Sequence, residues 1–490
     1  MKENIYETVY ITTSIPYVNA RPHIGFALEL VQADTLARYS RLLGYNTRFQ
    51  TGADENAFKN VLAAKELNIS TQELVDRNAE KFKKLAEVLN ASPDNFIRTT
   101  GEGHRTGVEF FWNRLRTGDV YQRDYIGLYC PGCEDFFIER DLIDGRCPDH
   151  GTRPIEVSES NYFFRLSAYQ EQLEDLLANN RIRIIPETRK NEVLTFVRQS
   201  LEDFSISRSS SRSEGWGIKV PGDPSQTIYV WVDALINYLS GLGYGQSELV
   251  GDFWSPDARK IHVIGKNVWK FHAVYWPCLL LSAGLPLPDA LLVHGFLTQG
   301  GRKISKSTGT AFDPISYTSA CGADSVRYFL LRAVSPFEDG DFSSERLVTL
   351  HNSDLANSLG NLVSRLASLC EKGDYGGFTK PDSLPAPDGF HEALGGFEFD
   401  RALKILWGLV SAMNRDIDQK QPWNYLKSKD LGKLYEDLDD WLNRLYTIAF
   451  WLQPFLPDAA SRILKLLGAK EIKSGEALFP RKANMACSNS

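Results

Sequence analysis

The pattern of apolar positions in the first 116 residues predicts alternating strands and helices. Residues 9–11 are apolar and predict a strand over residues 9–13. Between residues 22 and 43 the apolar positions recur mostly at helical spacing, with a proline at the start and Gly44 as a stop signal, so a helix is predicted there. A second strand is predicted near residues 47–50, just before Thr51-Gly52-Ala53-Asp54. This succession predicts an α/β, Rossmann-like parallel sheet.

The pattern changes after residue 116. Short strands, turns and cysteines fill the next stretch, and regular alternation returns at residues 227–233 and 260–265, which indicates that an insertion splits the sheet domain. From about residue 347 the apolar positions follow helical spacing and predict an all-α helix bundle. The predicted domains are the first half of the sheet domain (1–116), a connective insertion (117–225), the second half of the sheet domain (226–310), a linker domain (311–346) and the helix bundle (347–490).

Length, cysteine usage and charge limit the class of protein. At roughly 100–200 residues per domain, 490 residues should form several domains. The N-terminal residues lack the basic and apolar segments of a signal peptide, and no run of about 18 uncharged apolar residues occurs, so we expect a cytoplasmic protein. Seven cysteines in a long chain argue against a disulfide scaffold. The net charge of −7 predicts no global attraction to nucleic acid, so any RNA contact must use local basic patches.

Two segments far apart in the chain are suited to binding a nucleotide. His23 and Gly25 lie at the start of the first predicted helix, where free N–H groups and the helix dipole favour an anion. Lys303, Ser305 and Lys306 lie on a glycine-flanked loop that can bring cations to a triphosphate. Alone, the first segment is more often an ordinary helix start, and the second is also compatible with a solvated loop. Together they predict a nucleotide site.

Four residues of the insertion have the spacing of a zinc knuckle. Cys130-Pro-Gly-Cys133 is followed, after thirteen residues, by Cys147-Pro-Asp-His150. Three thiolates and one imidazole can close a tetrahedral zinc shell with no open position, so a structural zinc ion is predicted. The alternative is a set of free thiols or a vestigial site.

The two nucleotide-binding segments, His23-Ile24-Gly25-Phe26 and Lys303-Ile304-Ser305-Lys306-Ser307, resemble the HIGH and KMSKS signatures of class I aminoacyl-tRNA synthetases. Segments 13–19, 230–238 and 264–277 look like the substrate-pocket segments of the methionyl-tRNA synthetase family, in its bacterial type with a single zinc knuckle. Their aromatic and apolar side chains would suit a flexible thioether, because sulfur gains from contacts with aromatic rings. The resemblance extends over nearly the whole chain.

The resemblance implies an enzyme that uses ATP with Mg²⁺ to join L-methionine to tRNA(Met) through methionyl-adenylate. The linker would then contact the stem of the tRNA, and the helix bundle would bind its anticodon. Methionine would be bound by Ile15, Tyr17, Asp54, Trp231, Ala234, Leu235, Tyr238, Val268, His272 and Trp276, with Asp54 on the α-ammonium group. ATP would be bound by His23, Gly25, Glu29, Asn267, Lys303, Ser305 and Lys306, of which His23, Lys303 and Lys306 would be catalytic. The CAU anticodon would be recognised by Asn361, Arg365, Pro422 and Trp423.

Three residues depart from the family pattern. Phe26 stands where the HIGH signature has its second histidine, Asn56 replaces a histidine, and Asn267 replaces an aspartate expected near the ribose. An amide can still bond a ribose hydroxyl, but without charge. We expect a working enzyme in which other donors compensate for Phe26. A paralogue that binds tRNA without catalysis is the alternative of a different class.

Other class I synthetases, for cysteine, leucine, isoleucine or valine, are a further alternative. The large ones contain a long editing insertion, for which the connective insertion leaves little room. The cysteine enzymes place zinc in the amino-acid pocket, whereas here all four predicted ligands lie within the insertion.

The chain also ends soon after residue 481, without the dimerising C-terminal module that occurs often in the family, so a monomer is expected.

Overall fold

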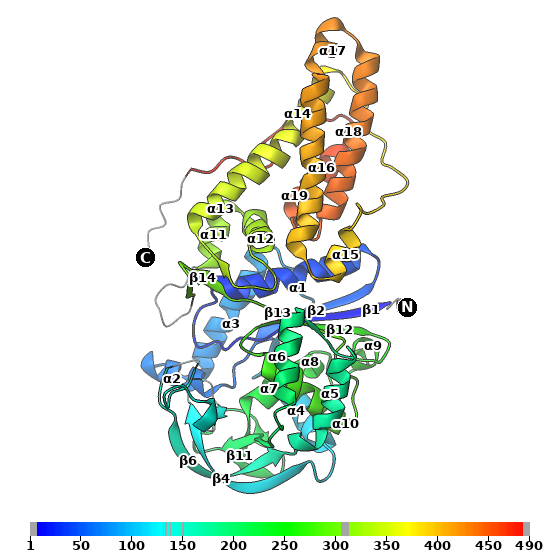
Figure 1. Ribbon diagram of the computed structural model, residues 1–490. Helices are drawn as coiled ribbons and strands as arrows, with labels where there is room; N and C mark the ends of the chain where they lie inside the picture. Colours follow the sequence, from blue (N-terminus) through cyan, green and yellow to red (C-terminus); the bar gives the residue numbers. More distant parts are fainter. Residues whose placement is uncertain are drawn as a thin grey trace. The chain divides into compact units, whose positions relative to one another are not determined.

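A computed structural model describes residues 7–130, 132, 135–137, 139–148, 151–304 and 313–483 (Figure 1). By its contacts this described chain divides into two compact units. The sheet unit comprises Met1–Pro22, Gly44–Lys84 and Pro93–His294, and the helical unit comprises His23–Leu43, Leu85–Ser92 and Gly295–Ser490.

The sheet unit is built on a parallel sheet with six strands among the described residues. In spatial order they are β3 (Asn95–Arg98), β2 (Asn46–Ala53), β1 (Thr8–Thr13), β12 (Arg259–Gly265), β13 (Ala290–His294) and β7 (Arg183–Ile185). All neighbours pair in parallel, and Thr13 of β1 lies opposite Val263 of β12. The predicted α/β parallel sheet is therefore confirmed.

The strand order reverses between β1 and β12. β2 and β3 follow on one side of β1, and β13 and β7 follow on the other side of β12. In open parallel sheets, ligands bind beyond the carboxyl ends of the strands at such a reversal. The segments that follow β1, β2 and β12 are therefore the first place to look for a site.

Antiparallel strands occupy much of the stretch predicted as an insertion. In the first sheet the strand order is β5 (Asp135–Phe137), β4 (Val120–Cys130), β6 (Ile155–Phe164) and β8 (Phe204–Ser205). In the second sheet the strand order is β10 (Lys219–Val220), β11 (Asp223–Ile228) and β9 (Ser207–Ser209). Strand β7 comes from the same stretch but pairs with β13 of the parallel sheet. The five-domain division stays a prediction.

Helices and a large apolar core complete the sheet unit. The helices are α2 (Phe58–Glu66), α3 (Thr71–Val88, whose end belongs to the helical unit), α4 (Glu102–Arg114), α5 (Gln170–Ala178), α6 (Glu187–Val197), α7 (Val230–Leu235), α8 (Asn237–Ser240), α9 (Leu249–Phe253), the π-helical segment η3 (Phe271–Tyr275) and α10 (Trp276–Ala283), with short 3₁₀ turns η1 (Glu139–Asp141) and η2 (Leu166–Tyr169). Tyr238, Trp254 and Trp276 are among the largest fully buried side chains.

The helical unit confirms the predicted helix bundle. It contains α1 (Ile24–Leu42), α11 (Pro314–Cys321), α12 (Ala323–Arg332), α13 (Ser344–Leu350), the π-helical segment η5 (His351–Gly360), α14 (Asn361–Lys372), α15 (Phe390–Gly395), α16 (Phe399–Lys420), α17 (Trp423–Ser428), α18 (Leu431–Leu452) and α19 (Pro457–Leu467). A small sheet has the order β15-β14-β16, from β15 (Arg302–Lys303), β14 (Leu297–Gln299) and β16 (Gly340–Asp341). Buried positions such as Leu403, Leu406 and Val410 of α16 recur at helical spacing and face the bundle interior.

A buried ion pair joins helix α1 to α12 within the helical unit. Nη1 of Arg327 on α12 lies 2.7 Å from Oδ2 of Asp34 on α1, and both side chains are fully buried. Arg327 also donates to the backbone oxygens of Phe455 at 2.7 Å and Pro454 at 2.9 Å. One guanidinium therefore connects α1, α12 and the turn between α18 and α19.

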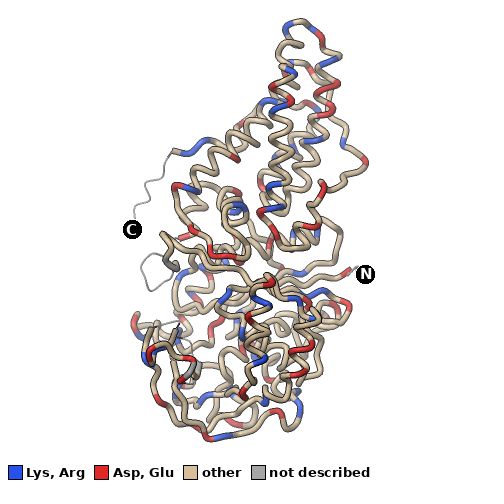
Figure 2. Tube along the Cα trace, viewed as in Figure 1, with Lys and Arg blue, Asp and Glu red and all other residues tan. Residues whose placement is uncertain are grey.

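Charged residues of both signs are interleaved along the backbone (Figure 2). This mixture agrees with the modest net charge of −7. Within the described ranges, no helix is long and apolar enough to cross a membrane.

Candidate functional site

The chain beyond β1 forms the first part of the site in the sheet unit. Tyr17 and Asp54 form a parallel β-bridge beyond the ends of β1 and β2, and the Asp54 N–H donates to the Pro16 oxygen at 2.9 Å. Asp54 is only 1% exposed. Ile15 lies against Gly52, where a Cβ would come within 3.0 Å of Cγ2 of Ile15. Three residues predicted to bind methionine are thus brought together at the carboxyl edge of the sheet.

Aromatic rings from α7 and η3 continue this site. The ring centroids of Tyr17 and Trp231 are 5.8 Å apart, and Trp231 stacks on Phe271 at 3.8 Å with an angle of 5° between the ring planes. The other predicted methionine-binding residues, Ala234, Leu235, Tyr238, Val268, His272 and Trp276, are all buried. Leu235, Tyr238, Val268 and Trp276 belong to one buried apolar cluster of the sheet unit, and Tyr17 and Trp231 pack against it.

Hydrogen bonds fix the tautomer of His272. Its Nδ1 lies 2.9 Å from the Val268 oxygen, which can only accept, so Nδ1 bears the proton. Nε2 then accepts from the Tyr238 hydroxyl at 2.7 Å. Burial lowers the pKa of His272 to about 4, although the Val268 bond acts in the opposite direction. The ring is therefore neutral near pH 7, and this part of the site is uncharged.

Two residues next to the Tyr238–His272 pair, His262 and Thr12, were not predicted from the sequence. His262 of β12 stacks on Tyr238 with ring centroids 4.1 Å apart, and its Nδ1 lies 2.7 Å from the Thr12 hydroxyl of β1. Burial lowers the pKa of His262 well below its usual range. The pattern gave one signal that could have found it, because His262 is a histidine inside an otherwise apolar predicted strand.

The structure explains why an amide is suited to position 56. The Asn56 side chain donates to Oδ2 of Asp233 at 2.8 Å and to the Thr99 oxygen at 3.0 Å. Asp233 is 1% exposed and its Oδ1 lies 2.5 Å from Nε2 of His104, whose Nδ1 lies 2.7 Å from the Ser240 hydroxyl. Asn56 thus belongs to a hydrogen-bonded network beside the site.

Asn267 lies just beyond β12 at the reversal of strand order. The Lys266 N–H donates to the His294 oxygen at 3.0 Å and the Val268 N–H to the Gly265 oxygen at 3.2 Å, so the backbone turns here. Asn267 is exposed. Its amide is placed at the edge where a nucleotide would enter the crevice.

In the helical unit, His23 caps α1. Its Nδ1 accepts the Gly25 N–H at 3.1 Å, and the N–H groups of Phe26 and Ala27 donate to its backbone oxygen at 3.0 and 3.3 Å. Because Nδ1 accepts, the proton of the neutral ring is on Nε2, which is the donor that a phosphate requires. Phe26 and Glu29, at 7% and 4% exposure, are buried side chains of the same helix.

The lysine segment is described only at its start. Lys303 lies on β15, opposite Thr298 of β14, after a turn in which Gly300 and Gly301 have φ of 55° and 76°. Nothing is described of the Lys303 side chain, and Ser305 and Lys306 lie outside the described residues.

Two of the four predicted zinc ligands are described. Cys130 at the end of β4 and Cys147 are both buried. Both contact Thr152: Sγ of Cys130 lies 3.9 Å from its Oγ1, and the Cys147 N–H donates to its backbone oxygen at 2.8 Å. Cys133 and His150 lie outside the described residues.

The four predicted anticodon residues are gathered in the helical unit. Asn361 and Arg365 lie one turn apart on α14, and the Arg365 guanidinium lies 6.0 Å from the ring centroid of Trp423. Arg365 donates to Oδ1 of Asp418 at 2.6 Å. Trp423 follows the buried Pro422 and is 39% exposed, so it is an accessible ring and not a core tryptophan.

Comparisons with known proteins agree with this fold. A family model described as tRNA synthetases class I (M) matches residues 9–154 and 141–367, which places the chain among the class I tRNA synthetases. The methionine–tRNA ligase of Mycobacterium tuberculosis (strain CDC 1551 / Oshkosh) is 42% identical over 482 residues, which cover 94% of this chain and 92% of that protein. That of Caldanaerobacter subterraneus subsp. tengcongensis is 40% identical over 510 residues, covering 97% and 79%.

Solved structures lead to the same family. The crystal structure of M. tuberculosis methionyl-tRNA synthetase bound by methionyl-adenylate is similar with a TM-score of 0.89 and 37% identity, over 96% of this chain and 100% of that chain. Its apo form gives a TM-score of 0.83 and 35% identity, over 99% and 100%. The chain belongs to the methionyl-tRNA synthetase family.

Proposed function

We propose that the protein is an ATP-dependent ligase that joins L-methionine to tRNA(Met), for initiation and elongation of protein synthesis. The observation that supports this most directly is the cluster of aromatic rings beside Asp54 at the carboxyl edge of the sheet, in a chain similar over its length to a synthetase solved with methionyl-adenylate.

Methionine binds at this cluster of rings in the sheet unit. The Asp54 carboxylate holds the α-ammonium group by a charge-assisted hydrogen bond. Tyr17, Trp231 and the Tyr238–His272 pair surround the side chain, where rings make favourable contacts with the thioether sulfur. The full methionine set is the ten residues Ile15, Tyr17, Asp54, Trp231, Ala234, Leu235, Tyr238, Val268, His272 and Trp276.

In the first step, a methionine carboxylate oxygen attacks the α-phosphorus of ATP. A new P–O bond gives methionyl-adenylate, and the bond to the β-phosphate oxygen breaks to release pyrophosphate. His23 donates from Nε2 to a phosphate oxygen, and Lys303 and Lys306 stabilise the charge that develops on the phosphates. One such preorganised group typically raises the rate about 10²–10³-fold. Mg²⁺ bound with ATP would neutralise part of the phosphate charge. Gly25, Glu29, Asn267 and Ser305 complete the ATP set.

In the second step, a hydroxyl of the ribose at the 3′ end of the tRNA attacks the methionyl carbonyl, and AMP leaves. No protein nucleophile is needed, because catalysis rests on positioning and electrostatic stabilisation. Asn361, Arg365, Pro422 and Trp423 recognise the CAU anticodon; the accessible Trp423 ring can stack on an unstacked base.

A structural zinc ion would be held by Cys130, Cys133, Cys147 and His150. The spacing of these four residues supports this, and the two described cysteines are near each other, since both are buried and both contact Thr152. Zinc would stabilise the fold of the knuckle and takes no part in the reaction. We also propose a cytoplasmic location, in agreement with the cysteine usage, and a monomeric state.

The test is aminoacylation of tRNA(Met) with labelled methionine. Charging of tRNA(Met), but not of a transcript in which the CAU anticodon is replaced, is the expected result. A protein that binds tRNA(Met) but leaves it uncharged at saturating ATP and methionine would instead be a paralogue that only binds tRNA.

A further inference from the structure

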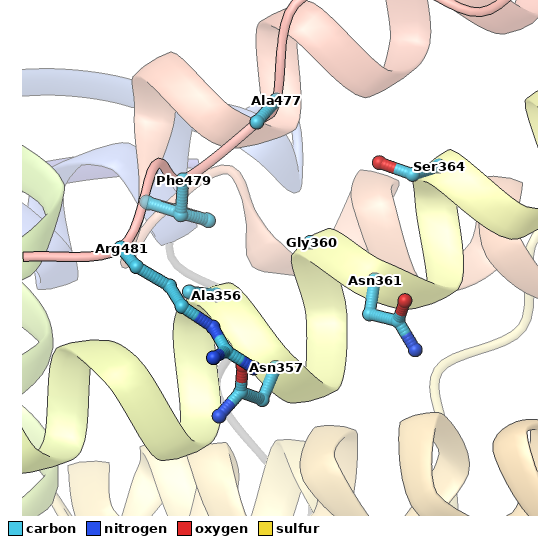
Figure 3. Close-up of a pocket in the computed structure, with 8 residues that line it drawn as sticks. All are labelled: Ala356, Asn357, Gly360, Asn361, Ser364, Ala477, Phe479 and Arg481. Atoms are coloured by element: carbon cyan, nitrogen blue, oxygen red, sulfur yellow. The ribbon is translucent and has the colours of Figure 1, made fainter.

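A pocket in the helical unit combines two helical segments with the chain that follows α19. It has a volume of about 390 Å³. The lining residues are Ala356, Asn357, Gly360, Asn361, Ser364, Ala477, Phe479 and Arg481. Figure 3 shows Arg481 and Asn357 together at one end of the pocket and Asn361 and Ser364 at the other. Asn361 is an anticodon residue of the proposed function, whereas Asn357, Phe479 and Arg481 have no role so far.

Side chains of the helices fix the non-helical segment that forms one wall. Arg462 donates to the Leu478 oxygen at 2.8 Å, and the His351 ring lies 2.9 Å from the Pro480 oxygen. The Asn352 amide both donates to the Lys482 oxygen and accepts its N–H, each at 2.9 Å. These bonds are on both sides of Phe479 and Arg481, so the two pocket side chains start from a defined backbone.

The chemistry of the pocket suits an unpaired nucleotide. Nε of Arg481 donates to Oδ1 of Asn357 at 2.9 Å, which orients the guanidinium and leaves its Nη groups with no ion pair to a described residue. Phe479 offers a half-buried ring. Asn357 and Asn361 offer amides that can bond the edge of a base. Aromatic rings, guanidinium groups and amides are the groups with which proteins bind unstacked RNA bases.

We propose that this pocket binds an unpaired nucleotide of the anticodon loop, so that the chain after α19 is part of the tRNA-binding surface. This inference rests on the proposed function for the identity of the RNA. Phe479 stacks on the base and Arg481 binds a phosphate or the base edge.

The test is the affinity of the full protein for a synthetic anticodon stem-loop of tRNA(Met). Arg481→Ala and Phe479→Leu should each weaken binding about tenfold. Arg481→Ala should also reduce the slope of log affinity against log salt by about 0.7, whereas Phe479→Leu should leave the slope unchanged. Lys470→Ala is the matched control, because Lys470 is an exposed basic residue of the same segment that does not line the pocket.

Methionine-dependent ATP–pyrophosphate exchange, measured without tRNA, separates this inference from the proposed function. Exchange equal to that of the unmodified protein shows that both variants are folded. Stem-loop affinities within twofold of the unmodified protein in both variants would overturn the proposal. A loss in Lys470→Ala as large as that in Arg481→Ala would overturn it as well, since the attraction would then be general. Absence of exchange in the unmodified protein would contradict the proposed function and not the pocket.

Discussion

The glycine at position 25 is required by the protein's own histidine. A Cβ on residue 25 would lie 2.9 Å from Cε1 and 3.0 Å from Nδ1 of His23. The sequence suggested nucleotide binding for both residues but could not show that they depend on each other. The His23 ring folds over residue 25 to accept its N–H, and only a glycine leaves the room.

Gly25→Ala should therefore displace the His23 ring and remove its proposed contact with ATP. We expect ATP–pyrophosphate exchange to fall by about 10²-fold, the typical loss for one preorganised donor, with methionine affinity unchanged. Gly408→Ala is the control, because its added methyl group meets no atom within 4 Å on helix α16. Exchange within twofold of normal in Gly25→Ala would show that the ring position is unimportant.

Methionine affinity should depend little on pH around neutrality. The pKa of His272 is lowered to about 4 by burial, so the ring stays neutral until the pH approaches that value, and Nε2 keeps accepting from Tyr238. In the unfolded chain the ring takes up a proton near pH 6.5, so the free energy of unfolding should fall as the pH is lowered from about 6.5 towards 4.

Tryptophan fluorescence titrations with methionine would measure this. A dissociation constant that is constant from about pH 8 to about pH 5.5, and rises below, agrees with a depressed pKa. A midpoint near the usual histidine value would contradict the assignment of a buried, neutral His272.

At the scale of elements, long apolar runs were predictable and short non-local pairings were not. The first strand, first helix and second strand were predicted near β1, α1 and β2, since each has a strong local pattern. Strand β7 was missed because three residues give no local signal and its partner β13 lies about a hundred residues later in the chain. Residues 227–233 are the end of β11 and helix α7, joined by a turn that their apolar character does not reveal.

The ion pair between Asp34 of α1 and Arg327 of α12 was equally invisible in the sequence, because the two residues lie far apart in the chain. Removing one partner leaves a buried charge unpaired, which typically costs about 3–5 kcal/mol. The nearby Arg38 side chain also bonds Asp34, through its Nε at 2.8 Å, and this moderates the loss. Arg327→Met should thus lower the free energy of unfolding by about 3 kcal/mol in urea denaturation.

The control is Lys404→Met. Lys404 pairs with Asp400 one turn away on α16, at 2.9 Å and largely in solvent, so its loss should cost less than about 0.5 kcal/mol. Equal losses in the two variants would mean that the Arg327 ion pair contributes no more than one on the surface.

The zinc knuckle is an element that sequence spacing alone predicts. Purified protein should contain one zinc ion per chain, and Cys147→Ser should lose it, because three remaining ligands do not close the tetrahedral shell. Elemental analysis measures this. Cys370→Ser, a change at a buried cysteine of α14, should keep the metal, and a zinc-free unmodified protein would contradict the proposed knuckle.

For the whole molecule, two of the predicted residue sets each lie within a single unit. All ten methionine residues lie in the sheet unit, and all four anticodon residues lie in the helical unit. Both sets could be predicted because their members lie in short motifs that are recognisable in the sequence. The contact between His262 and Thr12 could not be predicted, because strand pairing brings the two residues together from 250 positions apart.

Amino-acid-dependent ATP–pyrophosphate exchange against all twenty amino acids tests the central claim most directly. The proposed site predicts exchange with methionine alone, despite Phe26, Asn56 and Asn267. Exchange with another amino acid would contradict the pocket assignment while keeping the class. No exchange with any of the twenty, from folded and zinc-loaded protein, would contradict the claim that this chain forms methionyl-adenylate.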